Sequence, residues 1–285
     1  MAGLPEITLD SPMPVSIAEV REQLELDLTD GDRRLLGYFF LENDCRNLVR
    51  LLKNPAAQTE FDGNYTTEQY WDLISTAWED DYTTDRRYPA FMSDFARNYP
   101  ANKVRQGWFA EDAMLLAFYQ YAQQCSNKMI RSWYRLNLDI TNILTAMIAR
   151  QNGWNVSEYI QGDNEVTETI RSSQSRDFSL TATVDYMKEL MQIVDEQDPV
   201  LKEKRLDAFR WLWLDDQTFM DAFSVEAVFA YLCKLRMLSR WQQLDPETGR
   251  QTFSQIIEDL RSEARVPDEF KVNSVYNKNT GNYAK

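Results

Sequence analysis

The chain has 285 residues, of which 44% are hydrophobic and 27% charged, and its net charge is −14 at pH 7. A chain of this length and composition is typical of a globular protein that buries a sizeable core. The negative charge argues against a nucleic-acid partner, which requires a basic surface, and against unaided binding to an anionic membrane. It suits a soluble protein that meets basic surfaces of other proteins.

Helices are favoured along the whole chain, since only nine glycines and nine prolines interrupt it. Asp30 or Asp32 is expected to cap the second helix, Thr66 and Gln69 form a capping box, and Gly153 suits a left-handed helix end. The helices predicted from apolar spacing lie at 16–26, 33–53, 66–78, 91–99, 108–124, 129–151, 182–194, 201–214 and 224–243, with a last one ending at 261. No alternating strand pattern is found, so the predicted fold class is all-α.

Residue types and motifs that carry catalysis are missing from the sequence. It contains no histidine, which excludes Ser-His-Asp and Cys-His machinery, and no glycine-rich phosphate-binding motif. Cys45, Cys125 and Cys233 are far apart, so we expect reduced thiols that fill the core of a cytoplasmic protein. No apolar run approaches 18 residues, and the first ten residues lack the layout of a signal peptide. We therefore expect no catalytic residue, cofactor, metal site or membrane insertion.

One pattern occurs twice. The stretch DCRNLVRLLK begins at Asp44, and DITNILTAMI begins 95 positions later at Asp139. In each copy an asparagine, Asn47 or Asn142, follows the aspartate by three residues and therefore shares its helix face, beside an apolar stripe. A third copy at the same period would begin near Lys234, where the apolar stripe is present but the Asp and Asn are not. The pattern predicts three helical units of about 95 residues, with boundaries near 1–95, 96–190 and 191–285.

At this point the chain resembles the C subunits of V-type and archaeal-type rotary ATPases, which are called d subunits in eukaryotes, and more narrowly a bacterial branch of that family. The residues that carry the resemblance are AGLPEI near the start, DCRNLVRLLK, LDITNILTAMIARQNG and VFAYLCKLRMLSRW. The resemblance implies three related helical bundles in one elongated or funnel-like body. It spans most of the chain through short motifs, and the third copy departs from it by lacking the acid and the asparagine.

The same resemblance implies a function without catalysis. Members of that family sit on the membrane rotor ring, receive the central stalk and transmit torque between ATP turnover and proton or other ion transport. The expected partners are therefore the central-stalk and rotor-ring subunits. The expected location is cytoplasmic and peripheral to the membrane, through the complex alone. In the repeated pattern, Asp139 and Asn142 are expected to be structural, at least partly buried and hydrogen-bonded near a helix junction.

Two other interpretations remain open. Two acidic clusters are compatible with an all-α, Mg²⁺-dependent prenyl-diphosphate enzyme, because carboxylates are the ligands that Mg²⁺ prefers. However, the first cluster lies on a poor helix run, and the second is suited to capping a turn. The third interpretation is a generic helical scaffold that is unrelated to any ATPase. Separately, the aromatic run at 209–214 is interpreted as core or as a partner-binding ridge. The acidic residues are Asp80, Asp81, Asp85, Asp215, Asp216 and Asp221.

Overall fold

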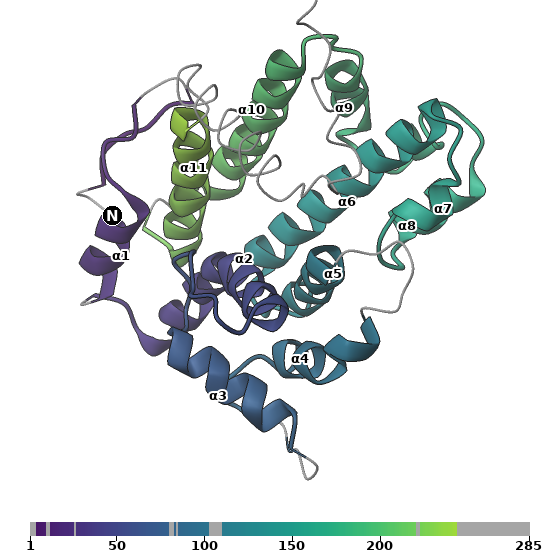
Figure 1. Ribbon diagram of the computed structural model, residues 1–285. Coiled ribbons are helices and arrows are strands. Elements are labelled where there is room, and N and C mark those ends of the chain that lie inside the picture. The colour runs from purple at the N-terminus through teal and green to yellow at the C-terminus, as the bar shows by residue number, and fades with distance from the viewer. Residues whose placement is uncertain are drawn as a thin grey trace, which may run out of the picture. The chain divides into compact units, whose positions relative to one another are not determined.

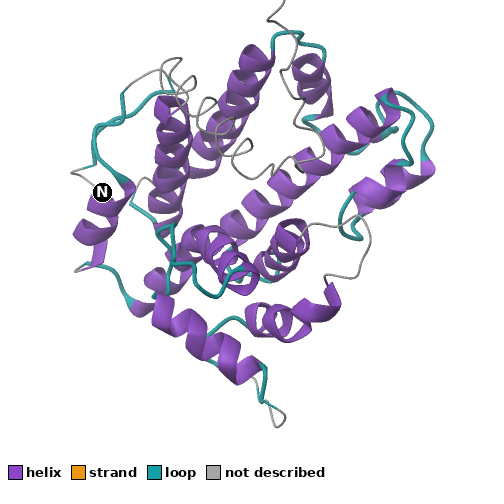
Figure 2. Cartoon of the chain, in the orientation of Figure 1, coloured by secondary structure: helices purple, strands orange, loops and turns teal. Residues whose placement is uncertain are grey.

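The computed structural model describes residues 4–9, 12–25, 27–79, 83, 85–102, 110–220 and 223–243. Within these residues the chain is all-helical and contains no strand (Figures 1 and 2), which confirms the predicted fold class. The α-helices are α1 (Ile17–Glu25), α2 (Asp30–Lys53), α3 (Thr67–Ala77), α4 (Ala90–Asn102), α5 (Ala110–Ala122), α6 (Lys128–Gln151), α7 (Val156–Tyr159), α8 (Glu165–Ser172), α9 (Met187–Val194), α10 (Pro199–Thr218) and α11 (Val225–Gln243), with a 3-10 turn η1 (Leu180–Ala182). The last expected helix, to 261, lies outside the described residues.

Residues at the helix ends explain where several helices begin or end. Thr66 and Gln69 form the predicted capping box of α3, each bonding the backbone N–H of the other. Gly153 has φ +70° and ends α6, and the N–H of Trp154 bonds the carbonyl of Ala149 at 2.8 Å. The cap of α2 differs from the prediction, because Thr29 accepts the N–H of Asp32 and the helix starts at Asp30.

Helix α4 is longer than predicted and continues past Pro100. A proline has no backbone N–H, so it leaves the carbonyl four residues earlier without its helical donor. That carbonyl belongs to Ala96, and it accepts the indole N–H of Trp78 at 3.0 Å. A side chain from the segment after α3 thus replaces the missing donor, which is why the proline does not end the helix.

The helix expected at 182–194 is shorter in the structure. A 3-10 turn occupies Leu180–Ala182, and α9 begins only at Met187. Ser179, which precedes the turn, has φ +61°, and the following stretch is rich in β-branched residues that favour helices weakly. Val184 is nevertheless buried in the core, so packing holds this non-helical segment in place.

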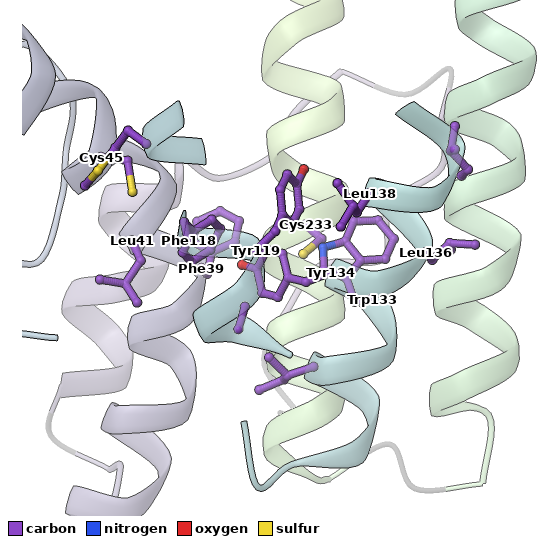
Figure 3. Close-up of a cluster of buried hydrophobic side chains, with 14 of the residues drawn as sticks. Phe39, Leu41, Cys45, Phe118, Tyr119, Trp133, Tyr134, Leu136, Leu138 and Cys233 are labelled. Carbon is purple, nitrogen blue, oxygen red and sulfur yellow. The ribbon is translucent and has the colours of Figure 1, made fainter. Parts of the chain in front are cut away.

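Aromatic side chains from α2, α5, α6 and α11 meet in the core of residues 1–238, which form one compact unit (Figure 3). The ring of Phe39 packs edge-on against Phe229, and Tyr134 packs in the same manner against both Phe118 and Phe229. The three cysteines are free and buried, as predicted. The expected unit boundaries at 95 and 190 fall inside α4 and α9, and the division into three bundles stays a prediction.

Polar contacts tie the same helices together. The hydroxyl of Tyr134 on α6 donates to the carbonyl of Tyr38 on α2 at 2.8 Å. Arg236 on α11 pairs with Glu42, donates to the carbonyl of Phe39 at 2.6 Å and lies over the Phe39 ring. Among the described helices, none is both long enough and apolar enough to cross a membrane.

Candidate functional site

The first copy of the repeated pattern is a buried hydrogen-bonded unit that joins α2 to the loop before α3. Asp44 is fully buried, and its Oδ1 accepts the N–H of Asn64 at 2.7 Å and the hydroxyl of Tyr70 at 2.5 Å. Its Oδ2 accepts the side-chain amide of Asn64 at 2.6 Å. The same amide group also donates to the carbonyl of Gly37 on α2 at 3.0 Å. Asn64 is thus hydrogen-bonded to two residues of α2, Gly37 and Asp44.

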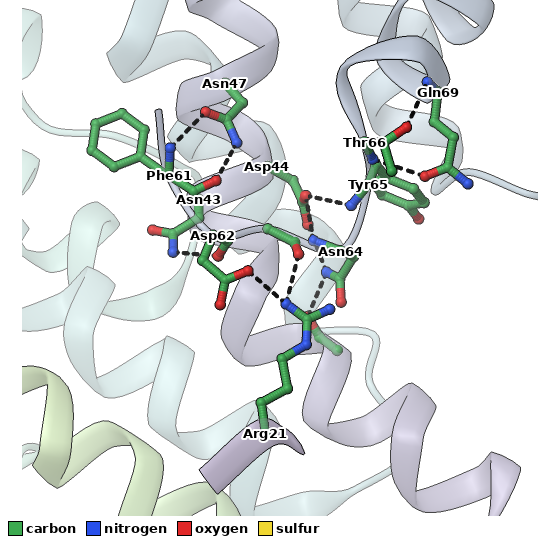
Figure 4. A network of polar contacts seen from close by, with 12 residues as sticks. Arg21, Asn43, Asp44, Asn47, Phe61, Asp62, Asn64, Tyr65, Thr66 and Gln69 are labelled. Atoms are coloured by element: carbon green, nitrogen blue, oxygen red, sulfur yellow. Dashed lines mark hydrogen bonds and ion pairs between the residues drawn. The ribbon is translucent and has the colours of Figure 1, made fainter. Parts of the chain in front are cut away.

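Asn47, one turn further along α2, binds the main chain of the same loop (Figure 4). Its Oδ1 accepts the N–H groups of Glu60 and Phe61, both at 3.1 Å, and its amide donates to the carbonyl of Phe61 at 2.7 Å. Asn47 is fully buried, so each of these contacts satisfies a group that water does not reach. We call Asp44, Asn47 and the bound loop residues 60–65 the first clamp.

Close approach in the first clamp requires a glycine. A Cβ on Gly63 would lie 2.2 Å from Oδ1 of Asp44, far inside van der Waals contact. Burial raises the pKa of Asp44 to about 6, although hydrogen bonds from Tyr70 and Asn64 oppose the shift by stabilising the charged form. At neutral pH the carboxyl group is therefore mostly ionised, and every contact described for it is with a donor.

The second copy makes the same kind of unit between α6 and the loop before α8. Asp139 accepts the side-chain amide of Asn164 at 2.7 Å, and Asn142 binds both the N–H and the carbonyl of Gln161, at 2.7 and 2.8 Å. Asp139 and Asn142 are 3% and 2% exposed, as the sequence predicts for structural residues. We call Asp139, Asn142 and the bound loop residues 161–164 the second clamp.

An arginine reinforces the loop of each clamp from a different element. Arg21 on α1 donates to the carboxylate of Asp62 at 2.9 Å and to the carbonyl of Gly63 at 2.8 Å. Arg171 on α8 donates to Asp163 at 3.1 Å and to the carbonyl of Gly162 at 2.9 Å. The two clamps therefore share an aspartate, two asparagines, a loop with an aspartate and a glycine, and a supporting arginine.

The third expected copy differs chemically. Lys234 lies on α11 as predicted, but its ammonium pairs with Asp215 of α10 and lies 5.1 Å from the centre of the Trp211 ring. Met237 takes the place of the asparagine, and it is buried in the apolar core. The segment that would form a third bound loop lies outside the described residues.

A basic cleft of about 770 Å³ adjoins the first clamp. Its lining includes the first turn of α2, with Arg33 and Arg34, and the turn before α4, with Arg86 and Arg87. Asn64 and Tyr65 of the clamp loop form part of its wall, and Tyr38, Tyr88 and Tyr121 complete an aromatic lining. Tyr38 and Tyr121 stack with ring centres 5.5 Å apart.

Two of the three described residues of the acidic clusters, Asp85 and Asp215, form ordinary ion pairs. Asp85 pairs with Arg87, which holds the pKa of the Asp85 carboxyl below its usual range. Asp215 and Asp216 lie inside α10, which runs to Thr218, and so do not cap the following turn as expected. Asp80, Asp81 and Asp221 lie outside the described residues. In the part of the chain that the structure describes, no group of three histidine, cysteine or acidic side chains is placed to hold a metal ion.

The aromatic run at 209–214 is mainly core. Phe209, Trp211 and Leu214 are buried and Trp213 is half-buried, whereas Leu212 is exposed. The arginine-rich cleft and the partners of the clamps were not predicted. The only sequence signal for the clamp loops is a glycine followed within two residues by an asparagine, in DGN and in GDN.

The fold and the clamps define an all-helical protein with an internally repeated helix–loop unit. The chain matches the family described as "Protein of unknown function (DUF2764)" over residues 1–264, and it belongs to that family. No curated protein and no solved structure shows significant similarity to it.

Proposed function

We propose that this protein is a non-catalytic central-stalk subunit of a V-type rotary ATPase, which couples the stalk to the membrane rotor ring. The observation that carries the proposal is the pair of clamps, in which the same buried Asp–Asn pattern binds the following loop twice. A protein built from similar helical units is what the resemblance to the C subunits of these ATPases implies. The clamps supply the rigidity that a torque-transmitting body needs, since they fix loops to long helices.

The charge of the chain supports a protein partner. With a net charge of −14, the surface favours basic protein faces and is repelled by anionic lipid. Under the proposal the protein lies at the cytoplasmic face of a membrane and is held there by the rotor ring. Association steered by exposed charges weakens as salt is added.

A pull-down from native membranes tests the proposal. The tagged full-length chain is incubated with detergent-solubilised membranes from cells that contain the ATPase, at low and at high ionic strength. We expect stalk and ring proteins of the ATPase at low salt and less of them at high salt. An unrelated helical protein of similar net charge is the matched control. Recovery of no ATPase component, or equal recovery by the control, would contradict the proposal.

The absence of catalysis is a separate expectation. The purified chain should not turn over ATP, a protein-kinase substrate or an allylic diphosphate with Mg²⁺ present. Turnover that is abolished by Asp80→Ala with Asp81→Ala would instead favour the prenyl-diphosphate enzyme.

A further inference from the structure

A cleft of opposite charge adjoins each clamp, on the corresponding side of α2 and of α6. Gly37 and the loop residue Tyr65 line the basic cleft. Ser132 and Glu165, which hold the same positions relative to the aspartate and the loop asparagine of the second clamp, line the hollow beside it. The basic cleft measures about 770 Å³ and is lined by four arginines and one carboxylate. The second hollow measures about 260 Å³ and is lined by one arginine and three carboxylates. The repeated architecture therefore does not by itself require a large basic cleft in the first copy.

The arginines of the basic cleft differ in how they are neutralised. Arg33 pairs with Asp30 at 2.9 Å, and Arg87 pairs with Asp72 at 2.7 Å and with Asp85 at 2.5 Å. Arg34 donates from Nε to the carbonyl of Asp30 at 3.2 Å, a bond that does not use its terminal amino groups. Neither Arg34 nor Arg86 forms an ion pair with another residue of the described chain, and both side chains are exposed. Two unpaired cations, one on α2 and one in the turn before α4, thus line the cleft.

Flat, fixed aromatic walls accompany these cations. Tyr38 stacks on Tyr121, and Tyr65 lies 5.1 Å from Tyr88, ring centre to ring centre. The backbone of Tyr38 is held by Tyr134, and the backbone of Tyr65 is held by Asp44 of the first clamp at 3.4 Å. Burial raises the pKa of Tyr38 and of Tyr65, so both phenols stay neutral hydrogen-bonding groups.

We propose that the basic cleft binds a small organic anion in which a phosphate or carboxylate group is joined to a flat ring. The guanidinium groups of Arg34 and Arg86 bind the oxyanion, because their planar donors match two oxygens at once. The tyrosine walls contact the ring. The volume of the cleft lies in the range of small-molecule sites, and the preformed clamp loop spares the ligand the cost of ordering the wall. This site is independent of the proposed stalk role.

Calorimetric titration of the full chain at low salt tests the site, with AMP as the phosphate probe and phthalate as the carboxylate probe. We expect saturable binding of at least one probe. Inorganic phosphate, which lacks a ring, should bind more weakly than the better probe. The double variant Arg34→Gln with Arg86→Gln should weaken binding by at least about tenfold, since it removes two charged hydrogen-bond donors.

The control variant is Arg176→Gln, which changes an exposed arginine that pairs with Asp195 away from the cleft lining. It should bind the probe as the unchanged protein does. A thermal melt of each variant checks that it is folded. Because all three arginines are exposed, we expect the melting temperatures to stay close to that of the unchanged protein. Binding of neither probe, equal binding by the double variant, or phosphate that binds as tightly as the ringed probes would each overturn the proposal.

Discussion

Two aspartates of one sequence pattern have different numbers of donors around them. Asp44 accepts four hydrogen bonds from Asn64, Tyr65 and Tyr70, whereas Asp139 accepts one from Asn164 and has Arg135 at 3.8 Å. Burial raises the pKa of both carboxyl groups, and these contacts oppose the shift in each case. Burying each carboxylate therefore costs free energy, and a few identified donors offset that cost. Substitution can remove these contacts one at a time.

Asp139→Ala should lower the free energy of unfolding by about 1–3 kcal/mol, because it leaves the amide of Asn164 without its acceptor in the second clamp. Chemical denaturation followed by circular dichroism measures the loss. Asp85→Ala is the comparison, since its carboxylate belongs to a surface ion pair with Arg87 that contributes little. Equal and negligible effects of the two changes would mean that the second clamp contributes no stability.

Asp44→Asn should change the pH dependence of stability. The pKa of Asp44 is about 6 in the folded chain, whereas the ordinary value for an aspartate is 3.8. The folded state therefore binds this proton more readily, so the stability that Asp44 contributes is fully present below about pH 4 and is lost as the pH rises through 6. The unfolding free energy of the unchanged chain minus that of Asp44→Asn should be larger at pH 4 than at pH 7, by about 2 kcal/mol.

Denaturant titrations of both proteins between pH 4 and pH 7 measure this difference. Groups that titrate in both proteins cancel in the comparison, so only the carboxyl group of Asp44 contributes to the slope. A difference that stays constant over this pH range, or that grows as the pH rises, would contradict the assignment.

At the scale of residues, the sequence predicted which side chains of each clamp lie on the helix but not what they bind. Asp44 precedes Asn64 by 20 positions and Asp139 precedes Asn164 by 25, so no fixed period connects the pairs. Asn47 and Asn142 bind backbone groups of Phe61 and Gln161, and the N–H that each of these donates is supplied alike by every residue type except proline.

Gly63→Ala tests the bound loop as an element. The added Cβ would meet the Asp44 carboxylate at 2.2 Å and the hydroxyl of Tyr70 at 2.9 Å, both of them buried. Because neither neighbour can withdraw without breaking a hydrogen bond, we expect a loss of about 1–3 kcal/mol in unfolding free energy. Thermal and denaturant unfolding measure it.

Gly31→Ala is the matched control for this change. Its Cβ would lie 3.6 Å from the hydroxyl of Thr29, an ordinary contact, in the first turn of α2. Alanine favours helix over glycine, so this variant should be as stable as the unchanged chain or slightly more stable. If both glycine variants were destabilised alike, loss of the clamp would not be the cause.

Helix ends were predictable where apolar periodicity and capping residues agreed. They were less predictable where a tertiary contact determines how far the helix continues. The capping box at Thr66 and the left-handed end at Gly153 follow from local chemistry. The continuation of α4 past Pro100 depends on a distant donor, Trp78, which no pattern within α4 indicates.

For the molecule as a whole, Arg236 is a contact between elements almost 200 positions apart. It binds both Glu42 and the carbonyl of Phe39, and its side chain is 32% exposed. Arg236→Ala should lower the free energy of unfolding by about 1–3 kcal/mol, because a half-buried carboxylate and a backbone carbonyl lose their donor.

A double-mutant cycle with Glu42→Ala separates the ion pair from the remaining contacts of Arg236. The two changes together should cost less than the sum of their separate costs, since each removes the same pair. Arg176→Ala, which breaks only a surface pair, should have little effect. Strict additivity of Arg236→Ala and Glu42→Ala would show that the pair does not stabilise the fold.

The all-α class was predictable from composition and apolar periodicity, whereas the basic cleft was not. Arg33 and Arg34 lie more than fifty positions before Arg86 and Arg87, and each pair taken alone resembles ordinary surface charge. Only the packing of α2 against α4 and α5 brings the two pairs and the four tyrosines to one cleft.

The way each clamp binds its loop affects how sequences of this kind can diverge. Asn47 and Asn142 contact peptide groups, so the residue at position 61 or 161 is free to vary, and it is phenylalanine in one copy and glutamine in the other. The segment between the clamp helix and the bound loop also tolerates insertion, because no contact of the clamp depends on how long that segment is. Proline is the one residue excluded at these two positions, since it has no N–H to donate. Two copies can therefore lose nearly all of their sequence identity while both keep the same contact between an asparagine and the backbone of the bound loop.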